Sequence, residues 1–404
     1  MRTDYLSARD AAARLGISLA TLYAYVSRGK VDSRPGADGR SREYLAEDVE
    51  RLIERRQAGR GAAQGAAHSL TWGLPVLETR ISLIRPHGHY YRGQPAVALA
   101  ESGAGLEDVA RLLWACGDAD PFDGAAPAGW SPAVRSLLGR GLPPLERTMA
   151  ALPLLGLSAP HALGADPVRR REGAARLLRE TAALLCAAKP DRRPIHARLA
   201  AAWGCDDARA QALLRGALVL CADHELNASA FAARVTASTG AGLHAAACAG
   251  LAALSGPRHG GAAARAHALI RHALRERDLP AYVRERLRHG DELPGFGHPL
   301  YPDGDPRAAL LLRMLGSAHP RLAGAARVRR LADAVVACCG RAPSLDFALA
   351  AIALLHDQDA EAALSLFAAG RMAGWLAHAL EQQEAGGLIR PRAHYAGAMP
   401  ERLR

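Results

Sequence analysis

Alanine and leucine recur along most of this chain at helical spacing, and this pattern narrows the choice of fold more than any other feature. Runs such as L-E-D-V-A-R-L-L-W repeat the 3.6-residue period of a helix and are interrupted by glycine and proline. Aromatic residues make up only 5% of the chain, whereas strands are enriched in aromatic and β-branched residues. A chain of 404 residues can bury a large core without disulfides or metals. We therefore expect a mainly α-helical protein of two or three domains.

Charge and cysteine content exclude few functions. The formal net charge of +11 would suit a polyanionic partner, but the basic residues are spread along the chain and nearly all are arginine, Lys30 and Lys189 being the exceptions. The seven cysteines form no C-x-x-C pair, so we expect reduced, structural thiols. We find neither a basic-plus-apolar leader nor an apolar run of about 18 to 20 residues, and we expect a cytoplasmic protein.

The N-terminal residues form a separate unit in the sequence pattern. We assign residues 1–60 to a small domain and residues 61–76, rich in Gly, Ala, Gln and Arg, to a linker. Ser7 is placed to cap a first helix, Gly16 to turn the chain, and Ser18 to cap a second helix from Leu19 to Arg28. This order of helix, turn and helix indicates a helix-turn-helix domain.

The second helix and the segment after it indicate where DNA would bind. Leu22 and Val26 would face inward, followed by a basic Gly/Pro-rich segment like a winged hairpin, Tyr44, and a closing helix from about residue 46 to 56. With S-A-R-D-A-A-A-R-L-G-I-S and T-L-Y-A-Y-V-S-R-G, the unit resembles MerR and excisionase DNA-binding domains. The expected DNA contacts are Thr21, Tyr25, Arg28, Arg40 and Arg42. The alternative is a packing module without nucleic acid, because the first turns of the second helix lack the side chains that read base edges.

Residues Leu77 to Tyr91 have β-type content and predict a short hairpin before the helices begin. His87 and His89 form an H-x-H pair there. A metal site is one interpretation, but further ligands are missing nearby, so we favour a turn with two surface histidines and expect no metal.

Four later segments place ionisable residues beside glycines within apolar helical sequence. They are D-H-E-L-N from Asp223, G-P-R-H-G-G from Gly256, P-G-F-G-H from Pro294 running into D-P-R at Asp305, and S-L-D-F from Ser344. Each segment alone is weak evidence for a catalytic site, because a single histidine is more often a hydrogen-bonded structural residue than a catalyst. Glycines would let backbone and ligand approach closely. Phosphate-loop and dinucleotide-binding motifs do not match.

Taken together, the four segments resemble the citrate synthase family in order and spacing, over roughly residues 70 to 404. Further matches are E-T-R-I-S-L-I, Y-Y-R-G, G-R-M-A-G-W-L-A-H and I-R-P-R-A-H-Y-A-G. The resemblance implies an α-helical homodimer, a citrate-synthase-like two-domain helical fold after the winged helix-turn-helix domain. The large domain would span residues 77–261 and 357–404, and the small domain, which closes over the substrates, residues 262–356.

The resemblance also implies roles for particular residues. Asp346 would remove a proton from the methyl group of acetyl-CoA, His259 would bind the thioester oxygen, and His298 would polarise the ketone of oxaloacetate. The carboxylates of oxaloacetate would be bound by His224, Arg307, Arg371 and Arg390. Arg390 would reach into the neighbouring subunit's site. No cofactor is implied, because acetyl-CoA is a substrate.

Departures from the family pattern leave the acyl substrate open. Ala263 and Ala264 stand where many relatives have asparagine and glutamate, Ser344-Leu345-Asp346 replaces N-V-D, and residues 299–302 replace a basic H-R-V-Y-K. The leading hypothesis is a citrate synthase using acetyl-CoA. The alternatives are a 2-methylcitrate synthase using propionyl-CoA, and a DNA-binding regulator whose synthase-like body senses metabolites. The retained Asp346, His259 and His298 favour an enzyme.

Overall fold

The structure is a computed structural model, which describes residues 5–27, 30–36, 41–46, 48–50, 52–53, 77–124, 129–157, 166–205, 207–318, 323–391 and 397. The chain forms two compact units. The first consists of residues 1–78 and 391–404, and the second of residues 79–390.

The first unit joins two short helices to a three-stranded antiparallel sheet of order β1-β3-β2. Its elements are β1 (Tyr5–Ser7), α1 (Ala8–Leu15), α2 (Leu19–Ser27), β2 (Ser33–Pro35) and β3 (Arg42–Leu45). The Ser7 side chain accepts a hydrogen bond from Asp10 N, and the Ser18 hydroxyl accepts one from Thr21 N at 3.2 Å. Both expected caps are therefore confirmed.

The core of the first unit forms between the helices and the sheet. Leu22 and Tyr44 are almost fully buried, with Val26 packed against them. Strands β2 and β3 pair as the expected wing, whereas β1 was not expected, because its pairing with β3 joins segments far apart in the sequence. Of the closing helix, residues 46, 48–50 and 52–53 are helical, and the others lie outside the described residues.

The second unit is helical apart from a small sheet at its start, which confirms a mainly α-helical protein. The sheet contains β4 (Ser82–Arg85), β5 (Gly88–Tyr91) and β6 (Gln94–Pro95), so the expected hairpin is confirmed. The helices are α5 (Ala96–Glu101), α6 (Leu106–Leu113), α7 (Pro132–Leu138), α8 (Pro144–Gly156), α9 (Pro167–Leu185), α10 (Ile195–Trp203), α11 (Ala208–Cys221), α12 (Ala228–Ser238), α13 (Leu243–Leu254), α14 (Gly261–Ala273), α15 (Leu279–Arg288), α16 (Pro306–Ala318), α17 (Ala323–Cys339), α18 (Leu345–Leu355) and α19 (Ala360–Ala385).

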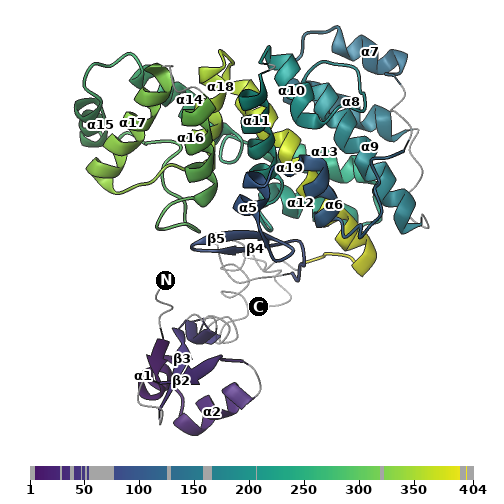
Figure 1. Ribbon diagram of the computed structural model, residues 1–404. Helices are drawn as coiled ribbons and strands as arrows, with labels where there is room; N and C mark the ends of the chain where they lie inside the picture. Colours follow the sequence, from purple (N-terminus) through teal and green to yellow (C-terminus); the bar gives the residue numbers. More distant parts are fainter. Residues whose placement is uncertain are drawn as a thin grey trace. The chain divides into compact units, whose positions relative to one another are not determined.

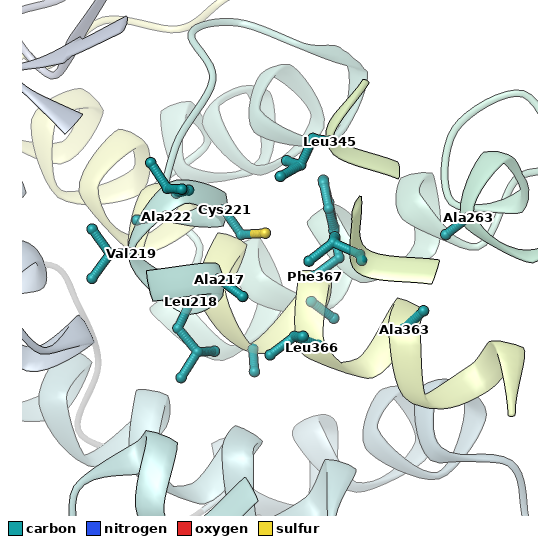
Figure 2. Close-up of a cluster of buried hydrophobic side chains, with 14 of the residues drawn as sticks. Ala217, Leu218, Val219, Cys221, Ala222, Ala263, Leu345, Ala363, Leu366 and Phe367 are labelled. Atoms are coloured by element: carbon teal, nitrogen blue, oxygen red, sulfur yellow. The ribbon is translucent and has the colours of Figure 1, made fainter. Parts of the chain in front are cut away.

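Helix α19 is the centre of the second unit. Every residue from Ser365 to Leu380 is buried, as expected for a helix that is covered on all sides. It packs against α9, α11, α12, α13 and α18. Figure 2 shows Leu218 and Cys221 of α11 facing Leu366 and Phe367 of α19 in this core. Small side chains along α19, mainly alanine, let the surrounding helices approach closely.

Helices α14 to α18 gather on one side of the second unit (Figure 1), where α15 packs on α17 and α18 packs on α14 and α16. They fall within the range expected for the small domain, whose boundaries stay a prediction. None of the helices in the described ranges is long and apolar enough to cross a membrane. All seven cysteines are free thiols, which agrees with the expected reduced state.

Two neighbouring valines of α17 test this packing. The Val335 side chain is fully buried, whereas 44% of Val336 is exposed. We expect Val335→Ala to lower the free energy of unfolding by about 2 kcal/mol, because it removes buried methyl groups and leaves a cavity. Val336→Ala should change it by less than about 0.5 kcal/mol. Urea titration of both variants followed by circular dichroism measures the difference, and equal effects would show that α17 is packed differently.

Candidate active site

Six of the expected site residues converge in the second unit. They are His224, His259, His298, Arg307, Asp346 and Arg371. Five of them lie in loops or in the first turn of a helix, and Arg371 lies in the middle of α19. Residues in loops and at helix ends can reach a ligand while the helices hold them in place.

A short backbone bridge holds the His298 loop against the start of α18. Phe296 and Pro343 form an isolated antiparallel bridge, and Ser344 N donates a hydrogen bond to Gly295 O at 2.8 Å. Gly295 has a φ of 86°, and a Cβ there would lie 3.0 Å from side-chain carbons of α14 and of α18. Only glycine fits this conformation without strain. The P-G-F-G-H motif is therefore joined to the S-L-D-F motif through the backbone.

The Asp305 carboxylate joins Arg307 to the start of α18. Its Oδ1 accepts from Arg307 Nε at 2.9 Å, and its Oδ2 accepts from Arg307 Nη2 at 2.8 Å. Oδ2 also accepts from Leu345 N at 3.1 Å, so it satisfies a free N–H group in the first turn of α18. Asp346 is the next residue. This two-point ion pair orients the guanidinium group and places it beside the Asp346 carboxyl.

Three rings form the wall next to Arg307. His224 Nε2 lies 3.0 Å from the Tyr301 hydroxyl, and the rings of His224 and His298 meet edge to face with centroids 5.3 Å apart. The Arg307 guanidinium lies 5.2 Å from the Tyr301 ring centroid. Leu300 N donates to His298 Nδ1 at 3.2 Å, so Nε2 carries the proton of the neutral His298 ring.

His259 is held by the start of α12. Its Nε2 lies 2.8 Å from the Ser229 hydroxyl, which also lies 2.8 Å from Asn227 Oδ1. Asn227 caps α12 by accepting from Ala230 N at 2.9 Å. The capping residue of one helix therefore sets the position of the serine that orients a histidine before another helix.

Arg371 is buried with part of its guanidinium unsatisfied. Its Nε donates to Cys221 O at 2.7 Å, and the group lies 4.6 Å from the Phe367 ring centroid. Nη1 is buried and has no hydrogen-bond partner among the described residues. The His259 ring also meets Phe367, with centroids 6.0 Å apart. A buried guanidinium with a free donor is suited to a carboxylate ligand.

Burial keeps the three histidines neutral. It lowers the pKa of His259 and of His298 to about 4, with Arg371 acting in the same direction on His259 and Arg307 on His298. For His224, burial, Arg307 and neighbouring imidazoles hold the pKa well below its usual range. Neutral imidazoles at pH 7 can each donate one hydrogen bond and accept another.

Asp346 shows the opposite shift. Burial raises its pKa to about 6, against the opposing effects of Arg307 and Arg371. The side chain is partly buried in the first turn of α18, where the helix N-terminus favours the anion. A carboxylate with a pKa closer to neutrality is a stronger base than an ordinary aspartate.

Three residues near the site were not predicted from their motifs. Tyr301 lies between the P-G-F-G-H and D-P-R segments, and Ser229 lies two residues after the D-H-E-L-N segment, but neither residue received a role. The expectation that His87 and His89 are both surface residues is wrong for His89, which is 2% exposed and contacts the His224 ring edge to face, with centroids 5.3 Å apart. Strand alternation explains this: His89 points to the buried face of β5. No group of metal-binding side chains occurs in the described part of the chain.

Arg390 lies apart from the cluster. It follows α19 in a segment without regular secondary structure, and its side chain is exposed. The neighbouring Ile389 N donates to Ser238 Oγ at the end of α12, at 3.1 Å. The position is compatible with a role in a second subunit, which remains a prediction.

The residues expected to contact DNA belong to the first unit. Arg42 is exposed on β3, whereas the Thr21 hydroxyl is held by Ser18 at 2.9 Å. Tyr25 was expected to face solvent but is partly buried against the core, and the exposed tyrosine of α2 is Tyr23, at 52%. Arg28 and Arg40 lie outside the described residues.

Comparison with known proteins assigns both parts of the chain. Residues 69–392 match the family model described as "Citrate synthase, C-terminal domain", and residues 5–57 match the one described as "Helix-turn-helix domain". Citrate synthase 2 of Bacillus subtilis is 38% identical over 185 residues, which cover 45% of this chain and 50% of that protein. The 2-methylcitrate synthase of Shewanella oneidensis is 34% identical over 193 residues, 46% of this chain and 50% of that protein.

A solved structure matches over a longer range. It is the ternary complex of Thermoplasma acidophilum citrate synthase with carboxymethyl coenzyme A and oxaloacetate, which is 25% identical and has a TM-score of 0.66. The match covers 82% of this chain and 97% of that one, although the chain spans about half the length of the curated relatives. Because the family model extends over most of the sequence and the helical fold agrees, this chain belongs to the citrate synthase family.

Proposed function

We propose that the chain is a condensing enzyme of the citrate synthase type, which joins an acyl-CoA to oxaloacetate. One observation carries the proposal: the Asp346 carboxyl, with its raised pKa, lies in the same cluster as neutral histidines and two buried guanidinium groups. A weakly acidic carbon can be deprotonated by a carboxylate only where positioned donors stabilise the oxyanion in a dry site. The cluster offers the carboxylate and the positioned donors.

Asp346 acts as the base in this proposal. It takes a proton from the carbon next to the thioester carbonyl of acetyl-CoA, while His259 donates a hydrogen bond to the thioester oxygen as the enolate forms. The Ser229 hydroxyl has one proton and two neighbours that can accept it. When it donates to His259 Nε2, the imidazole proton lies on Nδ1 and is available to the substrate. In the structure the hydroxyl donates to Asn227 Oδ1, so a donor at Nδ1 requires the hydroxyl to turn its proton to His259.

Oxaloacetate is the acceptor. The enolate carbon attacks its ketone carbon, and His298 donates a hydrogen bond from Nε2 to the ketone oxygen as that oxygen gains charge. Arg307 and Arg371 bind the two carboxylates with His224 assisting, which is supported by the unpartnered Arg371 Nη1. Water then cleaves the thioester and releases CoA. In this scheme the protein is a homodimer in which Arg390 completes the site of the partner subunit.

We propose acetyl-CoA as the acyl substrate and citrate as the product, with propionyl-CoA and 2-methylcitrate as the alternative. Relatives with both names match this chain, and the Thermoplasma complex holds oxaloacetate with a coenzyme A derivative. The reaction needs no cofactor, because the acyl-CoA is a substrate. We place the enzyme in the cytoplasm, which suits its seven free thiols.

DNA is the proposed partner of the first unit. The capped helices α1 and α2, the paired strands β2 and β3 and the match to a helix-turn-helix model support it. The exposed Arg42 would contact phosphates, whereas Arg34 is already engaged by Glu43 at 2.8 Å. A regulator that senses metabolites through its synthase-like body is the alternative. It needs the arginines of the site but not the base.

The first test is thiol release with oxaloacetate and a panel of acyl-CoAs. We expect the parent to be most active with acetyl-CoA. Asp346→Asn, His259→Ala and His298→Ala should each lower turnover at least about 100-fold, the scale expected for losing a general base or an oxyanion donor. Circular dichroism controls for folding. Folded variants that keep near-parental thiol release would contradict the assigned roles.

The pH profile tests the base separately. Because Asp346 must be ionised to accept a proton and its pKa is about 6, kcat/KM for the acyl-CoA should fall as the pH drops through about 6 and level off above it. His259 and His298, with pKa values of about 4, stay neutral over that range. Initial rates from pH 5 to 8 measure this. A profile that stays flat from pH 8 down to pH 5 would rule out the raised pKa, because an aspartate with the ordinary value of about 4 is ionised over that whole range.

DNA binding is tested by fluorescence titration of labelled duplexes at several salt concentrations. We expect affinity to fall steeply with salt, with modest discrimination between sequences. Arg42→Ala should weaken binding to all duplexes and reduce the salt slope by about one. Arg140→Ala, another exposed arginine but in the second unit, is the matched control and should bind like the parent. Equal DNA binding by both variants, or no DNA binding by the parent, would indicate that the first unit is an assembly module instead.

A further inference from the structure

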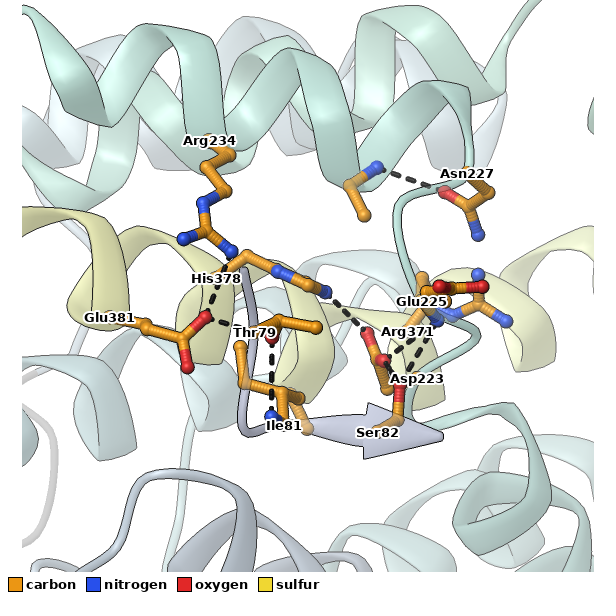
Figure 3. A network of polar contacts seen from close by, with 12 residues as sticks. Thr79, Ile81, Ser82, Asp223, Glu225, Asn227, Arg234, Arg371, His378 and Glu381 are labelled. Atoms are coloured by element: carbon orange, nitrogen blue, oxygen red, sulfur yellow. Dashed lines mark hydrogen bonds and ion pairs between the residues drawn. The ribbon is translucent and has the colours of Figure 1, made fainter. Parts of the chain in front are cut away.

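A carboxylate and an imidazole meet in the interior of the second unit, outside the set of residues assigned above. His378 Nε2 lies 3.2 Å from Asp223 Oδ1, and neither side chain is exposed to solvent. Figure 3 shows the contact between α19, which carries His378, and the loop after α11, which carries Asp223. Burial alone would raise the pKa of Asp223, but His378, Arg371 and Ser82 lower it to about 2. Asp223 is therefore an anion at neutral pH.

The other oxygen of Asp223 fixes the loop. Oδ2 accepts from the Ser82 hydroxyl of β4 and from Glu225 N at 3.0 Å. Glu225 N also lies within hydrogen-bonding distance of Ser82 Oγ, at 3.1 Å, and Glu225 has a φ of 55°. A non-glycine residue keeps this left-handed conformation only where its surroundings enforce it. His224 lies between these two residues, so the same contacts set its backbone.

The face of α19 that carries His378 also carries Arg371, two turns earlier. Arg371 Nε binds Cys221 O at one end of the loop, and His378 contacts Asp223 further along. Gly374 lies between them, where a Cβ would overlap with Asp223. One face of α19 thus holds residues 221–225 at two points. The Asp223 charge also offsets the burial that lowers the pKa of Arg371.

We propose that His378 is a positioning residue for the oxaloacetate subsite: through Asp223 it holds the His224 loop and the Arg371 guanidinium in the arrangement that binds the dicarboxylate. The inference rests on the proposed function. It predicts that a change of His378 weakens oxaloacetate binding more than acyl-CoA binding. His224 and Arg371 belong to the oxaloacetate side of the site, whereas the acyl-CoA side depends on Asp346 and His259.

A second polar network on α19 has no such link. Glu381 accepts from Thr79 Oγ1, from Arg80 N and from Arg234 Nη1, each at 2.8 Å. These contacts attach the start of the second unit to α12 and α19 (Figure 3) and include none of the assigned site residues. His378 therefore differs from Glu381 in its contact with the loop that carries His224, because both side chains belong to polar networks.

The experiment compares two buried histidines. His378→Leu removes the contact to Asp223, and His378→Gln keeps a side-chain donor at that position. His267→Leu is the matched control: His267 is 5% exposed on α14, and its Nε2 forms a hydrogen bond with Gln358 O at 3.1 Å. The readouts are the melting temperature, the Kd of oxaloacetate by calorimetry, and the KM of oxaloacetate and of the acyl-CoA in thiol release.

We expect His378→Leu to raise both the Kd and the KM of oxaloacetate about tenfold or more, since small displacements of binding groups cost affinity steeply. The KM of the acyl-CoA should stay within about twofold, and His378→Gln should recover most of the oxaloacetate affinity. His267→Leu should lower the melting temperature without changing the Kd of oxaloacetate. If His378→Leu does not fold, Ser82→Ala, which removes one donor to Asp223, takes its place. The KM of oxaloacetate should then rise more than the KM of the acyl-CoA.

The possible failures are distinguishable. Equal loss for both substrates, or the same change in His378→Leu and His267→Leu, would overturn the positioning role while the parent stays active. A parent that neither binds oxaloacetate nor releases thiol would overturn the proposed function, and the inference with it.

Discussion

The arrangement of the site depends on one buried carboxylate, Asp305. Each of its oxygens holds a nitrogen of the Arg307 guanidinium, and one of them also accepts from the N-terminal backbone of α18. A buried ion pair is costly to desolvate unless its remaining hydrogen-bonding capacity is filled, and here it is filled by backbone N–H groups. Because Tyr301 packs on Arg307 and Asp346 directly follows Leu345, whose N–H binds Asp305, a displacement of Asp305 would move Tyr301 and Asp346 together.

The protonation states of the site residues follow from which ionisable groups are buried next to one another. Two guanidinium groups and several imidazoles share a small volume, where burial keeps the imidazoles neutral and the nearby cations act in the same direction. Asp346 is close enough to both arginines for them to stabilise its anion, yet its burial has the larger effect. The site thereby keeps neutral donors and, in the proposed scheme, a base at neutral pH without a metal ion.

The sequence predicted those features that depend on local pattern or on complete motifs. Ser7 and Ser18 were identified as caps because a capping side chain acts within three residues. The six clustered residues were found because each lies in a segment resembling a family motif. Strand β1, the buried face of His89 and the Asp223–His378 pair were missed, because each depends on a partner distant in the sequence. The partial burial of Tyr25 was not predicted, because helical spacing alone does not say how wide the buried face of α2 is.

The segment between His298 and Asp305 is attached at both ends. Gly297 N binds Ala342 O before it, and Asp305 binds Leu345 N after it, so both ends join the strand-like entry into α18. Residues 299–304 therefore form a closed loop whose anchors do not depend on most of its own side chains. Such a loop can change its sequence during evolution while Asp346 and His298, the proposed base and ketone-binding residue, keep their spacing. The Pro299 to Pro302 stretch, which departs from the basic segment that the family resemblance implies, would be a change of this kind, and in the proposed enzyme it would alter which substrates are admitted without moving Asp346 or His298.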